Sequence, residues 1–415
     1  MTYIKPESTS NRSYIVKPIL ERGLEAAKRQ DWLEVSNQLK LLPQSETSSK
    51  TKLLDLAPSD WDLAFKLALK MLVAADFQHK WEITKLLPTF GSQIVVPLCT
   101  LVIDETIEGQ VRWFICKILG KFPQTRVILT LVELLQQTTD RELIAVAVKT
   151  LIEIGDPAIE ALIDLLSLPE HRHLAVQSLS YIRTASTIEP LLEVTTDEEP
   201  ELRTIAIAAL GSFHDRRIPP VLVAALEDKA SSVRKEAATA LGFRPDLCQK
   251  LDLVAHLQPL LYDLSLEVCR QAAIALGRMR QEVANTSLFE ALQADTTPLS
   301  LKLDLVKALG WSEMASGVDY LHQALSQGSE PVMREITTVL GKISTPDLKP
   351  QASLALIDFW HSQGACSPSI GQILATSLGE LRHEAAVPVL QELSQESDRK
   401  VQLHAVCALK KLGRL

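Results

Sequence analysis

The sequence has few aromatic residues and no long apolar segment. Phe, Trp and Tyr make up only 5% of its 415 residues, and the 46% of hydrophobic residues are mostly Leu, Ala, Val and Ile. The longest apolar run, 94–103, is ten residues long and contains a proline, whereas a bilayer span needs about 20 apolar residues. Residues 1–13 are polar and lack the apolar core of a secretory signal. We therefore expect no membrane insertion and a fold of thin helix–helix layers.

Short cysteine spacings and catalytic motifs are also absent. None of the six cysteines forms a CxxC pair or a short disulfide framework, which favours a reducing cytoplasm as the protein's location. The sequence contains no P-loop, no GxSxG and no GxGxxG motif. It therefore indicates no conventional enzyme, and the expectation is that the protein has no catalytic residues, no metal site and no required cofactor.

The chain is acidic overall. Its net charge is −8, with 13 Lys and Arg against 11 Asp and Glu in residues 1–90, and 30 against 40 in the remainder. Binding to a phosphate backbone relies on clustered Lys and Arg. We therefore expect no nucleic-acid partner.

A phrase that recurs at a nearly fixed interval is the main feature of the sequence. It reads LRTIAIAALGSFHD at 202–215 and VRKEAATALGFRPD at 233–246. From Gly211 to Gly413 the glycine that follows the apolar helix recurs after 31, 35, 33, 31, 38 and 34 residues. A period in this range is typical of stacked helical hairpins, each burying its apolar face against its neighbours. The predicted fold is an all-α, right-handed solenoid.

Composition and spacing divide the chain into three predicted parts. Residues 1–13 are expected to be a disordered tail, 14–90 a divergent N-terminal helical section, and 91–415 the repeat solenoid. Within the first section, the Ser- and Thr-rich stretch 43–52 predicts a loop. Ser59 or Asp60 is the expected N-cap of the helix that follows it.

One repeat, 197–228, illustrates the predicted unit. Leu202 to Leu210 form the first helix, and Gly211 is expected to end it in the left-handed conformation. Pro219 lies at the start of the second helix, where its missing N–H costs nothing. Leu241 and Leu276, which precede glycines in later repeats, are expected to be buried.

These phrases resemble HEAT repeats, and most closely the subtype first known from phycobilisome lyases. The resemblance is good over 200–345 and loose over 92–415. It implies one of two settings: the bilin lyases and their chaperone-like relatives, which act on phycobiliproteins, or the cyanobacterial HEAT-repeat partners of iron–sulfur scaffold proteins. A bilin or an iron–sulfur cluster is the ligand that these settings would imply. A HEAT-like nucleic-acid glycosylase is disfavoured by the acidic balance of 91–415.

Basic residues recur eight positions before the helix-ending glycine. They include Arg112, Arg203 and Arg234, and also Arg172, which is counted from Ser180 in place of the expected glycine. Asp197 and Asp228 lie six residues before Arg203 and Arg234. We interpret them as a structural ladder, in which arginines at helix starts pair with aspartates in turns of successive repeats. The alternative is an anion-binding stripe, which the alternating aspartates would weaken by cancelling its field.

Cysteine replaces arginine at one ladder position. Cys269 is either a buried neutral substitute or a thiol made more acidic by the neighbouring Arg270, and the former is favoured because reactivity requires exposure.

The 38-residue interval before Gly379 predicts an insertion. We expect a loop at 358–369 and consider Trp360, His361 and Cys366 candidate partner-binding residues, because an exposed aromatic side chain on a loop is a good binding anchor. The alternative is that Trp360 ends a helix and packs on its neighbour.

Together these features favour a non-catalytic adaptor or assembly factor that binds a protein partner on its concave surface, in iron–sulfur or photosynthetic-complex assembly. The second hypothesis is a bilin lyase or chromophore chaperone that acts on phycobiliproteins.

Overall fold

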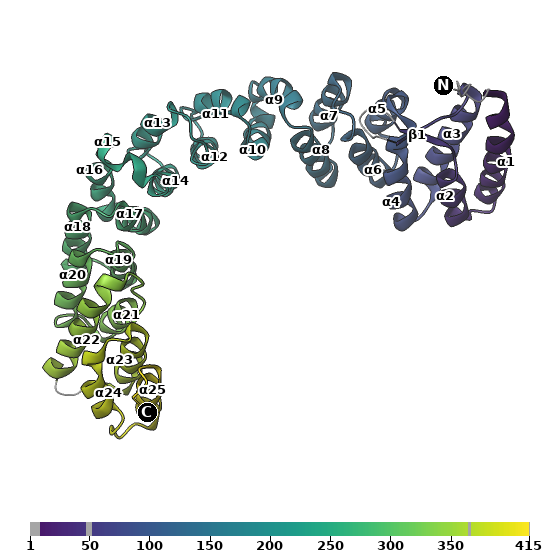
Figure 1. Ribbon diagram of the computed structural model, residues 1–415. Coiled ribbons are helices and arrows are strands. Elements are labelled where there is room, and N and C mark those ends of the chain that lie inside the picture. The colour runs from purple at the N-terminus through teal and green to yellow at the C-terminus, as the bar shows by residue number, and fades with distance from the viewer. Residues whose placement is uncertain (1–8, 47–51, 364–366, 415) are drawn as a thin grey trace, which may run out of the picture. The chain divides into compact units, whose positions relative to one another are not determined.

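The computed structural model describes residues 9–46, 52–363 and 367–414, and helices stacked in pairs make up nearly all of this part of the chain (Figure 1). The predicted all-α solenoid is therefore confirmed, with one short hairpin of strands near the N-terminus. The chain divides into two compact units, Met1–Leu191 and Leu192–Leu415. The division falls within the helix α11 (Ile188–Val194).

The first unit contains these further elements: α1 (Thr9–Lys28), α2 (Trp32–Lys40), β1 (Gln44–Glu46), β2 (Lys52–Leu54), α3 (Pro58–Ala74), α4 (Phe77–Leu86), η1 (Leu87–Phe90), η2 (Ser92–Ile94), α5 (Val95–Ile103), α6 (Gly109–Leu119), α7 (Thr125–Gln137), α8 (Arg141–Ile154), η3 (Asp156–Ala158), α9 (Ile159–Leu166), η4 (Pro169–His171), α10 (Arg172–Ile182) and η5 (Ala185–Thr187). Helices α6, α8 and α10 pack in one row, and α5, α7 and α9 pack in a second row beside them.

The second unit contains these elements: α12 (Pro200–Leu210), α13 (Ile218–Ala225), α14 (Ser231–Gly242), η6 (Pro245–Leu247), α15 (Cys248–Leu251), α16 (Leu253–Leu257), η7 (Gln258–Tyr262), α17 (Leu266–Met279), α18 (Glu282–Gln293), α19 (Leu299–Trp311), α20 (Ala315–Leu325), α21 (Glu330–Gly341), η8 (Pro346–Leu348), α22 (Lys349–Gln363), α23 (Pro368–Leu381), η9 (Glu384–Ala386), α24 (Val387–Leu393) and α25 (Arg399–Lys411). Figure 1 shows α12, α14, α17, α19, α21, α23 and α25 on the inside of this unit's bend; we call them the inner row. The other helices of the unit form its outer row.

The recurring glycines lie where helices of the inner row approach one another most closely. A Cβ atom on Gly277 would lie 2.5 Å from the backbone oxygen of Ala308, and one on Gly211 would lie 2.7 Å from the Cβ of Ala240. The recurring glycines from Gly211 to Gly379 therefore face the next helix of the row. The inner helices also pack more extensively on one another than the outer ones do. This tight spacing on one side accounts for the bend of the unit.

This geometry corrects the predicted role of Gly211. Its φ of −55° and ψ of −20° are right-handed, so the glycine serves close packing and not a left-handed C-cap. The left-handed positions after α10, α17 and α23 are instead taken by Arg183, Arg280 and Arg382. Leu241 and Leu276 are fully buried, as predicted.

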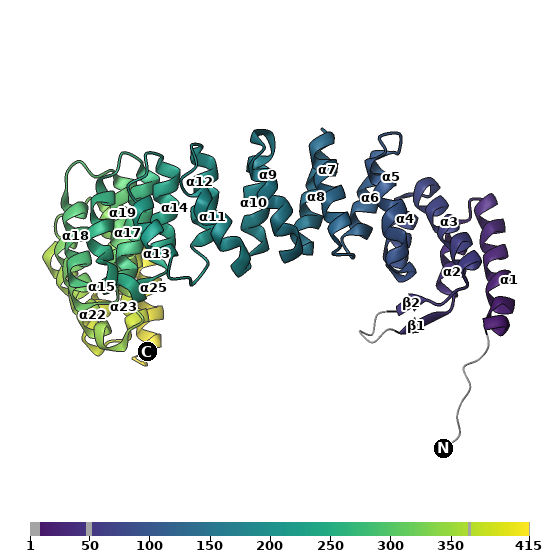
Figure 2. The same cartoon turned by 90° about the horizontal axis from the view of Figure 1, so that it is seen from above.

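The predicted loop at 43–52 is wrong in part. Strands β1 and β2 pair antiparallel, with Gln44 opposite Leu54 (Figure 2). The cause lies at the end of the Ser- and Thr-rich stretch, where the half-buried Leu53 and Leu54 pack the second strand against η1. Residues 47–51 lie outside the described part of the chain.

The N-terminal boundaries also differ from those predicted. Helix α1 begins at Thr9, inside the expected tail, of which residues 1–8 lie outside the described residues. Helix α3 begins at Pro58, so Ser59 and Asp60 lie within its first turn and do not cap it. Proline is favoured in a first turn because its fixed φ is already helical, and this moves the helix start two residues earlier.

The expected loop at 358–369 is largely helical. Helix α22 continues to Gln363, and α23 begins at Pro368. The extra residues of the longest interval therefore extend a helix of the outer row. Trp360 and His361 lie on its last turns, while Cys366 falls outside the described residues.

Candidate partner-binding surface

Two arginines of the inner row each bind the turn aspartate of the next repeat. Arg203 donates from Nε and Nη2 to the two carboxylate oxygens of Asp228, at 2.8 and 2.7 Å. Arg234 does the same with Asp263, at 2.7 and 2.8 Å. All four side chains are at least four-fifths buried. The pairing is the bidentate geometry that distinguishes arginine from lysine.

The same arginines also bind the turn before their own helix. Nη1 of Arg203 donates to the carbonyl oxygen of Asp197, and Nη1 of Arg234 donates to that of Asp228. The aspartates in turn accept from backbone amides: Asp228 from Ala230, and Asp263 from Ser265. Each arginine therefore joins two successive turns, and its charge is used inside the scaffold.

The charges of the ladder stabilise one another. The hydrogen bond from Arg234 outweighs the effect of burial and holds the pKa of Asp263 below its ordinary value. Burial works against ionisation of Asp228, but the bonds from Arg203 and the Ala230 amide outweigh it, so its pKa is also lowered. The aspartates in turn raise the pKa of both arginines.

Cys269 occupies the next ladder position and makes part of the same contact. It is buried, and its Sγ donates to the carbonyl oxygen of Asp263 at 3.2 Å. Burial raises the pKa of the Cys269 thiol, so this geometry corresponds to a buried neutral substitute. The neighbouring Arg270 binds Asp304 and Glu267.

The sequence interpretation overlooked Gln402, which makes the same turn contact in the last repeat. Its Nε2 donates to the carbonyl oxygen of Glu396, six residues earlier, at 2.7 Å. The spacing of six residues is the signal that would have identified it, because that spacing also separates the turn residue from Arg203, Arg234 and Cys269.

The remaining predicted ladder residues, Arg112, Arg172 and Asp197, lie in different surroundings. Arg112 is buried and donates from Nε to the carbonyl oxygen of Val102 at 2.7 Å. Arg172 is the first residue of α10. Asp197, in the second unit, accepts from the backbone amide of Glu199.

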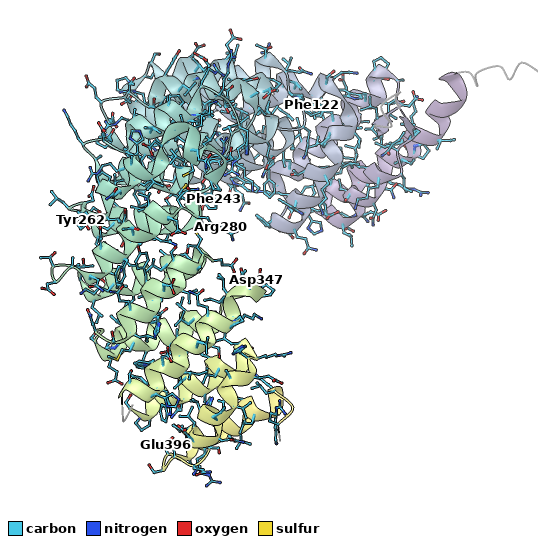
Figure 3. The ribbon with its side chains drawn as sticks, turned by 60° about the vertical axis from the view of Figure 1, so that its left-hand side comes forward. Phe122, Phe243, Tyr262, Arg280, Asp347 and Glu396 are labelled. Carbon is cyan, nitrogen blue, oxygen red and sulfur yellow. The ribbon has the colours of Figure 1, made fainter. Side chains whose placement is uncertain are left out.

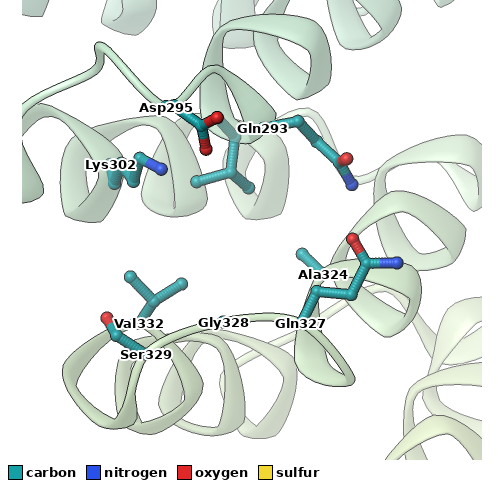
Figure 4. A pocket seen from close by; sticks show the side chains of 9 residues that line it. Gln293, Asp295, Lys302, Ala324, Gln327, Gly328, Ser329 and Val332 are labelled. Atoms are coloured by element: carbon teal, nitrogen blue, oxygen red, sulfur yellow. The ribbon is translucent and has the colours of Figure 1, made fainter.

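A hollow of about 230 Å³ opens where the pattern is interrupted, between α19 and α21 (Figure 4). Lys302 takes the arginine position in this repeat. Gln327 takes the aspartate position of the next turn: it lies two residues before the N-cap of α21, as Asp228 and Asp263 lie two residues before the N-caps of α14 and α17. Among the described residues, no ion pair joins Lys302 to a carboxylate. The hollow is lined by Lys302 together with Asp295, Gln293 and Gln327, so the bidentate arginine–aspartate pair of the earlier repeats is replaced here.

A second hollow, of about 300 Å³, lies on the inner row between α21, α23 and α25. Thr338, Ile373, Thr376 and His404 line it, together with Lys342 and Glu380. The hydroxyl of Thr376 donates to the carbonyl oxygen of Gln372 and also lies 2.9 Å from His404 Nδ1.

The candidate binding residues at the end of α22 lie on the outer row. Trp360 is half-buried, and its Nε1 donates to Glu392 of α24 at 2.8 Å. His361 is exposed. The structure thus brings Trp360 to the neighbouring repeat, while its part in partner binding stays a prediction.

The described residues contain neither a single membrane-spanning helix nor a cluster of metal ligands. No single helix there is long and apolar enough to cross a bilayer, although the pair 77–90 and 92–103, bent by 113°, reaches that length and composition jointly. In the same residues, no group of three or more His, Cys, Asp or Glu side chains is placed to hold a metal ion.

Comparison with known proteins agrees with this architecture. The family model for HEAT repeats matches residues 101–179, 159–242, 188–273 and 219–300. The stacked pairs of helices define an α-solenoid. With these matches, residues 101–300 of the chain contain HEAT repeats.

A curated relative and two solved structures are also similar. An uncharacterized phycocyanin operon protein Z from Pseudanabaena tenuis is 26% identical over 175 residues, which are 41% of this chain and 86% of that protein. This similarity bears out the predicted resemblance to the phycobilisome-lyase type of repeat. Kap95p, solved with RanGDP, has a TM-score of 0.46 at 15% identity and covers 92% of this chain and 54% of its own. The YibA protein of Escherichia coli has a TM-score of 0.42 at 18% identity, covering 67% and 99%.

Proposed function

We propose that the protein is a non-catalytic adaptor or assembly factor that binds a protein partner on the inner row of its second unit. The observation that carries this proposal is that some polar side chains of that row are paired within the scaffold while others line an open hollow. Arg203 and Arg234 are used within the scaffold, whereas the hollow beside Ile373 and Thr376 is open and is lined by side chains of three successive repeats. Stacked repeats commonly use such an inner surface for binding.

The similarity to a phycocyanin operon protein favours a setting in photosynthetic-complex assembly. Within this proposal, the partner is a protein of that complex or one that matures it, in the cytoplasm. Iron–sulfur assembly stays a prediction of the family resemblance alone.

A bilin lyase or chromophore chaperone is the second candidate, and the same relative favours it. In this case the bilin would be a substrate or cargo carried to a phycobiliprotein, and the inner row would contact the phycobiliprotein. The two candidates differ in one cheap measurement, because a bilin absorbs visible light. An absorbance spectrum of the protein purified from its native cell distinguishes them: visible bands from a bilin favour the second candidate, and a colourless protein favours the plain adaptor.

The adaptor proposal is tested by photo-crosslinking in the native cell. A photoreactive amino acid replaces Ile373 on the inner row in one variant and His361 at the end of α22 in another, with exposed Tyr262 on the outer row as the matched control. We expect one protein to be crosslinked through position 373 and not through position 262. Crosslinking through 361 but not 373 would transfer the site to the end of α22, and crosslinking through none of the three would contradict the proposal.

A further inference from the structure

One register of the inner row carries large exposed side chains in four successive repeats. The residue directly after each recurring glycine is Phe243, Arg278, Trp311 and Lys342 in turn. Phe243 is 64% exposed and Trp311 is 50% exposed, and both cationic residues are also exposed. We call these four residues the edge stripe. Aromatic and cationic side chains alternate along it.

The glycines hold the members of the edge stripe close together. A Cβ atom on Gly242 would lie 3.1 Å from Ala275 of the next inner helix, and one on Gly277 would lie 2.5 Å from Ala308. Helices in contact have axes about 8–10 Å apart, so the four side chains cover roughly 25–30 Å. An extended peptide advances about 3.3 Å per residue, and a segment of about ten residues therefore spans the stripe.

The two cations of the edge stripe are available to a ligand. Among the described residues, neither Arg278 nor Lys342 forms an ion pair; the guanidinium of Arg278 lies over the ring of Phe243, 4.4 Å from its centroid. Stacking in this way leaves the edge of the guanidinium open to a carboxylate. By contrast, the neighbouring Arg280 is paired with Glu313, and Arg244 is paired with Asp246.

The stripe also leads to an apolar space. Lys342, its last member, lines the 300 Å³ hollow together with Ile373 and Thr338. A side chain that follows a carboxylate bound at Lys342 would therefore meet a hollow suited to an apolar group. Figure 3 shows Phe243 and Arg280 on one side of the second unit and Tyr262 on the opposite side.

We propose that the edge stripe binds an extended segment of a protein partner in which acidic residues and aromatic or aliphatic residues follow one another at every third position. In a polyproline II conformation this spacing places them on one face, about 9 Å apart. Its carboxylates bind Arg278 and Lys342, and its apolar side chains pack on Phe243 and Trp311. Charge complementarity selects this occupant over a nucleic acid, because the edge stripe offers two cations, Arg278 and Lys342, that form no ion pair among the described residues, whereas phosphate-backbone binding needs many cations. The inference rests on the proposed function and names the chemistry of the partner.

A defined peptide tests this proposal without knowledge of the native partner. The probe is a fluorescein-labelled peptide of about ten residues that carries Phe and Asp in turn at every third position, with serine between them. Its binding to the full chain is followed by fluorescence anisotropy. We expect saturable binding that weakens as salt rises. Trp311→Ala should weaken it by roughly 30-fold, the loss typical of an interface anchor, and Arg278→Glu and Lys342→Glu should each weaken it at least tenfold, about 1.4 kcal/mol or more.

Matched controls separate the stripe from general surface effects. Tyr262→Ala removes an exposed aromatic ring from the outer row, and Lys250→Glu reverses an exposed outer charge; both should bind like the original chain. Circular dichroism checks that all variants fold, which is expected because the changed side chains are exposed.

Three results would overturn the proposal: stripe variants that bind normally, equal binding of the same peptide with Asn in place of Asp, or displacement of the probe by oligothymidine at equal concentration. Loss of crosslinking at position 373 would count against the proposed function, whereas these results count only against the edge stripe.

Discussion

At the scale of the residue, the ladder arginines show how one side chain can stabilise two turns. From the sequence, the Arg–Asp pairs are expected to be partly exposed, and each would then contribute about 0–1 kcal/mol to the free energy of unfolding. In the structure, Arg234 and Asp263 are only 16% and 10% exposed, and their bonds are bidentate. Removing one partner of such a pair leaves the other charge poorly solvated.

Arg234→Ala should therefore lower the free energy of unfolding by about 1–3 kcal/mol, because Asp263 loses both bonds at once. Urea unfolding measures the loss. Lys229→Ala, an exposed side chain in the preceding turn, is the matched control and should be within about 0.5 kcal/mol of the original chain. Partner crosslinking should survive in the folded fraction of Arg234→Ala, and its loss would move the arginine from the scaffold to the binding surface.

The lowered pKa values of Asp228 and Asp263 predict a loss of stability in acid. A carboxyl group whose folded pKa lies below its unfolded value contributes stability above the unfolded pKa and loses it as the pH falls through the folded pKa. The ordinary aspartate value is 3.8, so the urea midpoint should change little from pH 7 to 5 and fall below pH 4. Asp263→Asn should be less stable at pH 7 and show a shallower fall; an unchanged acid slope would mean that this pair does not contribute.

At the scale of the element, tight glycine contacts determine how the inner helices stack. Gly277→Ala should lower the free energy of unfolding by about 1–3 kcal/mol. Its Cβ would lie 2.5 Å from the backbone oxygen of Ala308, which can move only if the whole helix α19 shifts. Gly371→Ala is the comparison, since its nearest neighbours are methyl groups of Val401 at 3.2 and 3.3 Å and no backbone atom lies as close as the Ala308 oxygen lies to Gly277. Thermal unfolding of the two variants should rank Gly277→Ala as the less stable, and the reverse order would contradict the packing role.

Individual elements also show what the sequence reveals and what it does not. The buried Leu241 and the start of α13 near Pro219 follow from local pattern and proline chemistry, and both are observed. The right-handed Gly211 does not follow, because the reason for glycine there lies on a neighbouring helix, 29 residues along the chain at Ala240. The last residues of α22, 358–363, are predicted as a loop because the apolar pattern of the helix is weak and Gly364 and Pro368 lie just beyond it.

The candidate site was less accessible to sequence reasoning than the fold. The Arg203–Asp228 pair could be proposed from spacing, since the repeat itself relates the two residues. The edge stripe could not, because exposure of Phe243 and Trp311 depends on where each helix ends in three dimensions. The hollow beside Ile373 likewise requires three helices to be placed together.

At the scale of the whole molecule, stacked repeats predict that damage stays local. Leu241→Ala truncates a fully buried side chain of α14. It should lower the free energy of unfolding by about 2–5 kcal/mol. Hydrogen exchange should show the loss of protection mainly in α12, α14 and α17, which pack directly on one another. Equal loss across all described helices would indicate a single cooperative globule instead.

The central claim is that the inner row of the second unit is the surface that a protein partner covers. Hydrogen exchange of the chain, with and without the partner identified by crosslinking at position 373, tests it across every described helix. The account predicts new protection at the exposed ends of α14, α17, α19, α21 and α23, and none in the outer helices α13, α18 and α20. Protection confined to the outer row or to the first unit would contradict it.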